Sequence, residues 1–117
     1  MTSVVKVDMR ACDHVCRVKV SAREDGDMDV CIESDCKNVQ EYARRLTRLT
    51  LEDATDYRKT KIYNPDYTEP LSLTCLCPVA VMTAAWKEVG MVSKTICKQA
   101  HSNELILDIY DEDEEKE

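Results

Sequence analysis

The chain has 117 residues, of which 44% are hydrophobic and 33% are charged, and its formal net charge is −7. This length suffices for one domain with its own core, and this balance excludes an intrinsically disordered chain. The acidic surface disfavours binding to the phosphate backbone of a nucleic acid. Phenylalanine is absent, so we expect a core of aliphatic side chains and cysteine, with Trp86 as its one large anchor.

Three alternating segments predict an antiparallel meander in the first third of the chain. Residues 4–10, 16–21 and 28–33 each place apolar side chains on one face and polar side chains on the other. That period of two residues is typical of half-buried strands. Residues 11–14 break the alternation as a turn, and Gly26 indicates the hairpin loop between the second and third strands.

Helix signals follow the meander. Ser34-Asp35 predicts a helix start, and the apolar stripe beyond it fits a helix from about residue 36 to residue 48. The sequence Thr50-Leu51-Glu52-Asp53 predicts a capping box that opens a shorter second helix.

A buried helix and a last strand are expected in the second half of the chain. Pro78 suits the start of a helix and Gly90 its end, so we expect the apolar residues 79–89 to form the most buried element. Alternation from Leu105 to Tyr110 predicts a final strand.

These elements predict an α+β fold. We expect the order βββα(α)αβ, with a four-stranded, mainly antiparallel sheet covered on one face by two or three helices. Residues 1–110 are expected to form a single domain, and residues 111–117 an acidic disordered tail. Because the first strand starts near Met1 and no apolar stretch could span a bilayer, we expect neither a signal peptide nor a membrane segment, and a cytoplasmic location.

Seven cysteines are the strongest chemical signal. Their odd number and the expected cytoplasmic location favour free thiols or metal ligands over a disulfide framework. Cys16 is in phase with the core-facing valines of its strand and is expected to be a small buried hydrophobic residue. Cys31 falls on the outer face, and Cys97 has no partner at ligand spacing, so both are expected to be incidental.

The other four cysteines, Cys12, Cys36, Cys75 and Cys77, each lie at the end of an element. A thiolate at a helix N-terminus is stabilised by free N–H groups and the helix dipole. If the element ends converge on one edge of the sheet, Cys12, Cys36 and Cys77 could hold zinc or an iron–sulfur cluster, with Cys75 or His14 as the fourth ligand.

Two other classes of function stay open. The chain could be an interaction module with structural cysteines, or a thiol redox protein that uses Cys75 and Cys77. The residues show no glycine-rich phosphate loop and no spaced nucleophile, histidine and acid set, which favours a non-enzymatic, accessory role. We expect no nucleic-acid or membrane partner, and we leave an unidentified protein partner and a homodimer open.

Three motifs resemble those of a small uncharacterised family. They are Ile32-Glu33-Ser34-Asp35-Cys36, Cys77-Pro78-Val79 and the run from Ala84 to Met91. They are similar to domain-of-unknown-function proteins of methanogenic archaea and other anaerobes, which carry cysteines in the first turn, in a Ser-Asp-Cys step and in a Cys-Pro-Val step. The resemblance spans most of the chain, departs from the family at Asp13-His14 in the first turn, and implies no activity. It implies the same three cysteines: Cys12, Cys36 and Cys77.

Overall fold

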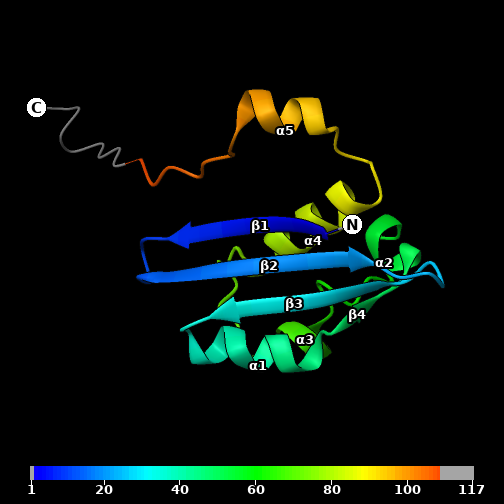
Figure 1. Cartoon of the computed structure of the whole chain (residues 1–117). Helices are drawn as coiled ribbons and strands as arrows, with labels where there is room; N and C mark the ends of the chain where they lie inside the picture. Colours follow the sequence, from blue (N-terminus) through cyan, green and yellow to red (C-terminus); the bar gives the residue numbers. More distant parts are fainter. Residues whose placement is uncertain (1, 109–117) are drawn as a thin grey trace, which may run out of the picture.

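A single antiparallel sheet forms the centre of the molecule in a computed structural model that describes residues 2–108. The strands are β1 (Thr2–Met9), β2 (His14–Ala22), β3 (Met28–Ser34) and β4 (Arg48–Leu49). They lie in the order β1-β2-β3-β4, and every neighbouring pair is antiparallel (Figure 1). The predicted three-stranded meander is therefore confirmed.

Helices cover one face of this sheet. They are α1 (Lys37–Arg45), α2 (Leu51–Thr55), α3 (Pro65–Thr68) and α4 (Cys77–Glu88), while a further helix, α5 (Lys94–Ala100), lies apart from this layer (Figure 1). Helix α4 packs on β1 and β2, and α1 packs on β3. Helices α2 and α3 contact α4 and α1, respectively. This arrangement confirms the predicted α+β fold with helices on one face.

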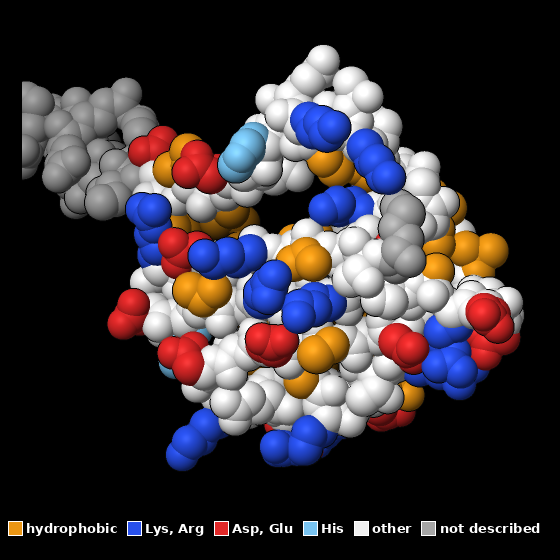
Figure 2. Space-filling model, viewed as in Figure 1, with side chains coloured by type: hydrophobic (Ala, Val, Ile, Leu, Met, Phe, Trp, Pro, Cys, Tyr) orange, Lys and Arg blue, Asp and Glu red, His pale blue; other side chains and the backbone are white. Residues whose placement is uncertain are grey.

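The other face of the sheet carries charged side chains. Lys6, Arg17 and Glu33 lie in register across β1, β2 and β3, and basic and acidic side chains intermix over the sheet in Figure 2. The strands thus follow the alternation of their sequences, with one apolar and one charged face.

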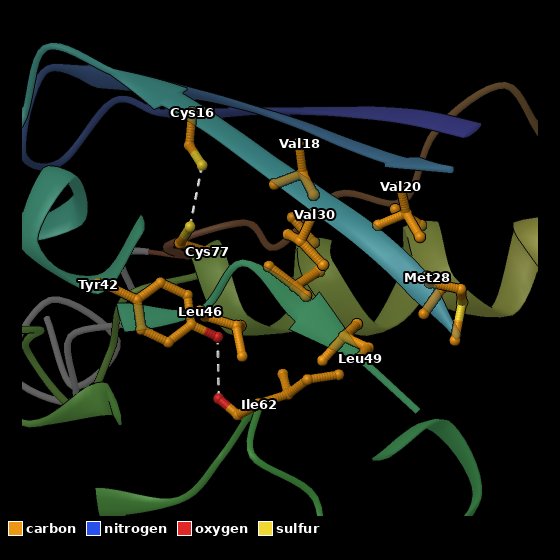
Figure 3. Packing of buried hydrophobic residues seen from close by; sticks show 14 of the residues in the cluster. Cys16, Val18, Val20, Met28, Val30, Tyr42, Leu46, Leu49, Ile62 and Cys77 are labelled. Atoms are coloured by element: carbon orange, nitrogen blue, oxygen red, sulfur yellow. Dashed lines mark hydrogen bonds between the residues drawn. The ribbon is translucent and has the colours of Figure 1, made fainter. Parts of the chain in front are cut away.

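The core lies between the sheet and helices α1 and α4. Strand β2 contributes Cys16, Val18 and Val20, which have no exposed surface, and the first turn of α4 contributes the equally buried Cys77 (Figure 3). The largest fully buried side chain is Tyr42 of α1. The prediction of Trp86 as the large anchor is wrong, because this side chain is 39% exposed and its Nε1 donates to the Ala54 carbonyl oxygen.

The position of the fourth strand also differs from the prediction. Helix α1 ends at Arg45 rather than near residue 48, because Leu46 leaves the helical conformation, and Arg48–Leu49 then pairs with β3 as β4. Residues 101–108 contain no strand. Their apolar side chains Leu105, Ile106 and Leu107 are exposed, and they follow α5, which stands off from the sheet (Figure 1).

The remainder of that predicted strand, residues 109 and 110, lies outside the described part of the chain, as does the predicted acidic tail. Among residues 2–108, no helix is both long enough and apolar enough to cross a membrane.

Asp53 organises the region between β4 and α3. The predicted capping box is confirmed: Asp53 N–H donates to Thr50 Oγ1, and Thr50 N–H donates to Asp53 Oδ2 at 2.8 Å. Asp53 Oδ1 also accepts from the Lys61 backbone N–H at 3.0 Å, and the Lys61 ammonium lies 3.2 Å from Oδ2. Burial alone would raise the pKa of Asp53, but these partners together hold the pKa of the carboxyl below its usual range.

Replacing Asp53 with asparagine should make folding stability less dependent on pH. We expect Asp53→Asn to lower the free energy of unfolding at pH 7 by about 1–3 kcal/mol, because the charged acceptor is lost. A depressed pKa stabilises the fold above the unfolded-state pKa of about 3.9, and this contribution is lost as the pH falls through the folded-state value. The difference between the two proteins in urea unfolding should therefore shrink below about pH 4. The exposed Glu52→Gln on the same helix serves as control, and an equal loss there would contradict the assignment.

The buried hydroxyl of Tyr42 offers a second test of the core. It donates to the Ile62 carbonyl oxygen at 2.9 Å. Tyr42→Phe leaves that carbonyl without this donor, and we expect the free energy of unfolding to fall by about 1–2 kcal/mol in urea titrations. Tyr57→Phe makes the same chemical change on a side chain that is 81% exposed, and it should shift the value by less than about 0.5 kcal/mol.

Candidate functional site

Five of the seven cysteines gather at one end of the sheet, which we call the cysteine-rich end. They are Cys12, Cys16, Cys36, Cys75 and Cys77. This end carries the β1–β2 turn, the end of β3 and the start of α1, at the left in Figure 1, and the first turn of α4 meets β2 there. The thiols are close enough for the charge on one to affect the ionisation of others.

The remaining two cysteines lie elsewhere. Cys31 is exposed on the outer face of β3, opposite Lys19 of β2, as its phase predicts. Cys97 lies on α5. Neither belongs to the cysteine-rich end, so both serve as controls for experiments on the other five.

A buried pair, Cys16 and Cys77, lies at the bottom of this end. Their Sγ atoms are 3.0 Å apart and form a hydrogen bond, and neither residue has any exposed surface (Figure 3). Cys16 faces the core because it shares the phase of Val18 and Val20, as predicted. Cys77 is the first residue of α4, where the following Pro78 suits the helix start.

The hydrogen bond within this pair lowers the pKa of Cys16, against the effect of burial, and raises the pKa of Cys77. The hydrogen bond with Cys16 and then burial raise the pKa of Cys77 far above its ordinary value. Two adjacent thiolates would repel each other without water to screen them, so the pair carries at most one negative charge. Within this pair Cys77 is therefore the residue that keeps its proton.

Cys75 lies between the buried pair and the surface. It is half-buried, and its Sγ is 3.9 Å from the Met9 thioether sulfur. Burial raises the pKa of Cys75, and a hydrogen bond from the Cys77 backbone N–H opposes this effect in part. Cys75 is therefore more accessible than Cys77 and has a donor that stabilises its thiolate.

Cys12 and Cys36 lie at the rim. Cys12 is exposed in the β1–β2 turn, and its thiol donates to the Met9 carbonyl oxygen at 3.5 Å. The next residue, Asp13, has a φ of 59°, the left-handed conformation of a tight turn. Cys36 is half-buried at the N-cap of α1, where its side chain makes no capping hydrogen bond and its backbone N–H donates to Ser34 Oγ.

His14 is engaged with a carboxylate. His14 is the first residue of β2, and its Nδ1 lies 3.0 Å from Asp35 Oδ1. This hydrogen bond holds the pKa of Asp35 below its usual range. The contact occupies Nδ1 and leaves Nε2 as the ring nitrogen that could serve as a ligand.

The side chains at this end do not close around one point. Within residues 2–108, no group of three or more histidine, cysteine, aspartate or glutamate side chains is close enough to hold a metal ion. The predicted ligands Cys12, Cys36, Cys75 and Cys77 thus share one end of the sheet, while the closest contact of Cys77 is with Cys16.

Sequence reasoning placed Cys16 in the core but missed its contact with Cys77. The two residues are 61 positions apart, and no local spacing connects them. The only available signal was that both are in phase with core-facing positions of their elements.

Comparison with known proteins identifies the family. Residues 3–100 match DUF6951, a family of unknown function. The chain belongs to this family. The matched segment includes all seven cysteines and ends with α5. The match confirms the resemblance to an uncharacterised family, whereas the source organisms and the three-cysteine pattern stay predictions. No curated protein and no solved structure gives a significant match.

Thiol reactivity should follow burial at this end. We expect Cys12 and Cys31 to be alkylated first in the native, metal-free protein, with Cys16 and Cys77 on the order of a hundredfold slower, because the pair must wait for local opening. Each rate is measured by alkylation with light and then heavy N-ethylmaleimide, before and after unfolding. An arginine- and lysine-specific digest is then fragmented in the mass spectrometer, which separates Cys12 from Cys16 and Cys75 from Cys77 within their shared peptides. Equal rates for Cys16 and Cys12 would contradict the buried pair.

Proposed function

We propose that this protein binds a metal ion, either zinc or the iron of an iron–sulfur cluster, through cysteine thiolates at the cysteine-rich end, in an accessory rather than enzymatic role. The observation that carries the proposal is the gathering of five thiols from separate segments at one end of a small sheet. A reducing cytoplasm would keep these thiols free.

The donor chemistry fits such a group. Thiolates are the preferred ligands of zinc and of iron–sulfur clusters. Cys77 and Cys75 would hold the group from the start of α4, Cys36 from the start of α1 and Cys12 from the β1–β2 turn. When bound, zinc would supply a Lewis acid and a cluster would supply an electron carrier.

The required rearrangement is local. Cys12 lies in an exposed turn and Cys36 makes no capping hydrogen bond with its side chain, so both thiols can change rotamer without breaking the sheet. Cys77 would have to turn from Cys16 toward the other ligands. Around tetrahedral zinc with bonds of about 2.3 Å, the sulfur atoms of the ligands would be roughly 3.8 Å apart. Three ligands would leave one position for Cys75, His14 or a partner's side chain.

Ionisation sets the pH dependence of binding. Burial raises the pKa of Cys75, and the hydrogen bond with Cys16 together with burial raises the pKa of Cys77, so a cation must displace their protons when it binds. The affinity for the metal ion should therefore rise with pH, because fewer protons then compete for the thiolates.

Anaerobic purification tests the proposal. We expect about one equivalent of zinc, or iron with inorganic sulfide and visible absorption, by elemental analysis and spectroscopy. Cys36→Ser and Cys12→Ser should each lower the metal content or weaken binding by about tenfold or more. The matched variants Cys31→Ser and Cys97→Ser should leave binding unchanged.

A metal-free product with seven titratable thiols, after reconstitution with zinc or with iron and sulfide, would overturn the proposal. Equal effects of Cys31→Ser and Cys36→Ser would also count against it, because the site would then not lie at the cysteine-rich end. Circular dichroism of each variant separates a lost ligand from a lost fold.

A further inference from the structure

We propose that Cys75, Cys77 and Cys16 form a thiol–disulfide exchange site that reduces low-molecular-weight disulfides. Three thiols lead from the surface into the core: Cys75 is half-buried, and Cys77 and Cys16 are fully buried. The oxidised product is a disulfide between Cys16 and Cys77. This activity needs no bound metal and goes beyond the proposed function.

The buried pair is placed for bond formation. Its Sγ–Sγ distance of 3.0 Å exceeds a disulfide bond of about 2.05 Å by roughly 1 Å, which small side-chain rotations can close. Both ends are firmly held. Cys16 is paired on both sides, with Val7 of β1 and Ser34 of β3, and Cys77 begins the helix that packs on β1 and β2.

Access explains why a third thiol is needed. A disulfide reagent cannot reach Cys16 or Cys77, because neither has exposed surface. Cys75 is accessible and lies two positions from Cys77 along the chain. Cys75 is therefore the thiol that meets the reagent.

The chemistry consists of three exchanges. The Cys75 thiolate attacks a disulfide RS–SR, forms a Cys75–S–S–R bond and releases RS⁻. The Cys77 thiolate then attacks Cys75 Sγ and expels the second RS⁻. Finally, the Cys16 thiolate attacks Cys77 Sγ, forms the Cys16–Cys77 bond and regenerates the Cys75 thiolate. The two thiol protons of the pair leave on the two RS⁻ groups, so RSSR is reduced to two RSH while the pair loses two electrons.

The final exchange favours the buried pair over a bond between Cys75 and Cys77. That intermediate closes a ring across Leu76 alone, at the turn where α4 begins. A Cys16–Cys77 bond instead joins two ordered elements whose sulfur atoms are already in contact. It also closes a long loop, which restricts the unfolded chain.

The test uses the reduced 117-residue chain and oxidised glutathione in a buffer that contains a metal chelator. After an acid quench and alkylation with N-ethylmaleimide, we expect two fewer alkylated thiols and the loss of two hydrogen atoms from the protein mass. The oxidised form should also unfold at a temperature higher by about 10 °C or more.

Mapping the bond needs one variant. Trypsin releases Cys12 with Cys16 in residues 11–17, and Cys75 with Cys77 in residues 62–87, so the native digest cannot assign it. In the double variant Cys12→Ser/Cys75→Ser, each peptide keeps one cysteine. Slow oxidation of this variant at equilibrium should link Cys16 to Cys77.

Rates test the role of Cys75. Cys75→Ser should slow formation of the bond at least about tenfold, because the reagent must then wait for the buried pair to open. Cys31→Ser, which removes an exposed thiol elsewhere, should leave the rate unchanged. Cys16→Ala should stop the reaction at a bond between Cys75 and Cys77 or at the glutathione adduct.

Two results would overturn the inference: a protein whose Cys16 and Cys77 stay alkylatable on unfolding after oxidation, or a native oxidation rate in Cys75→Ser. Because chelator is present throughout, both results are independent of metal binding. A protein that binds zinc but forms no bond would refute this inference alone, and one that forms the bond but binds no metal would refute only the proposed function.

Discussion

The packing of the first turn of α4 on β2 is the contact on which the rest of the molecule depends. Cys77 and Cys16 meet there with no exposed surface, next to the valines that join the sheet to the helix. The same contact fixes Cys75 just outside the core, and it brings the start of α4 to the end of the sheet that carries the β1–β2 turn and the start of α1. Without this contact the cysteines of the second half of the chain would not lie near those of the first.

Local patterns predicted the elements with one buried and one exposed face. The meander, the Thr50–Asp53 capping box and the start of α4 at Cys77-Pro78 follow from neighbouring residues alone. The fourth strand does not follow from neighbouring residues. Alternation shows that a segment can form a strand, but it does not show that the segment has another strand to pair with. Arg48–Leu49 pairs with β3 because α1 ends early, at Arg45. Strand β1 forms the opposite edge of the sheet, and there Lys87 Nζ of α4 donates to the Val4 carbonyl oxygen.

The candidate site could be predicted only in part, for a related reason. The alternation of strand residues predicted Cys16 in the core and Cys31 on the outer face of the sheet. Positions at the ends of helices and strands identified the candidate ligands Cys12, Cys36, Cys75 and Cys77. All four do lie at one end of the sheet, together with Cys16. What the sequence could not reveal was which thiols touch, since the Cys16–Cys77 contact joins residues 61 positions apart. Long-range contacts depend on how helices cross a sheet, which no short spacing encodes.

The two proposed activities compete for Cys77. A metal ligand must be a thiolate facing out toward Cys75 and Cys36, whereas the disulfide requires the same sulfur to face Cys16. The hydrogen bond with Cys16 and then burial raise the pKa of Cys77, so in neither use is the thiolate available without assistance. A cation supplies that assistance by replacing the proton, and in the exchange the RS⁻ that Cys75 releases from the reagent can accept the proton of Cys77. If both proposals hold, oxidation would release a bound metal and a bound metal would protect the buried pair. The redox state of one hydrogen-bonded contact would then control the chemistry of the whole cysteine-rich end.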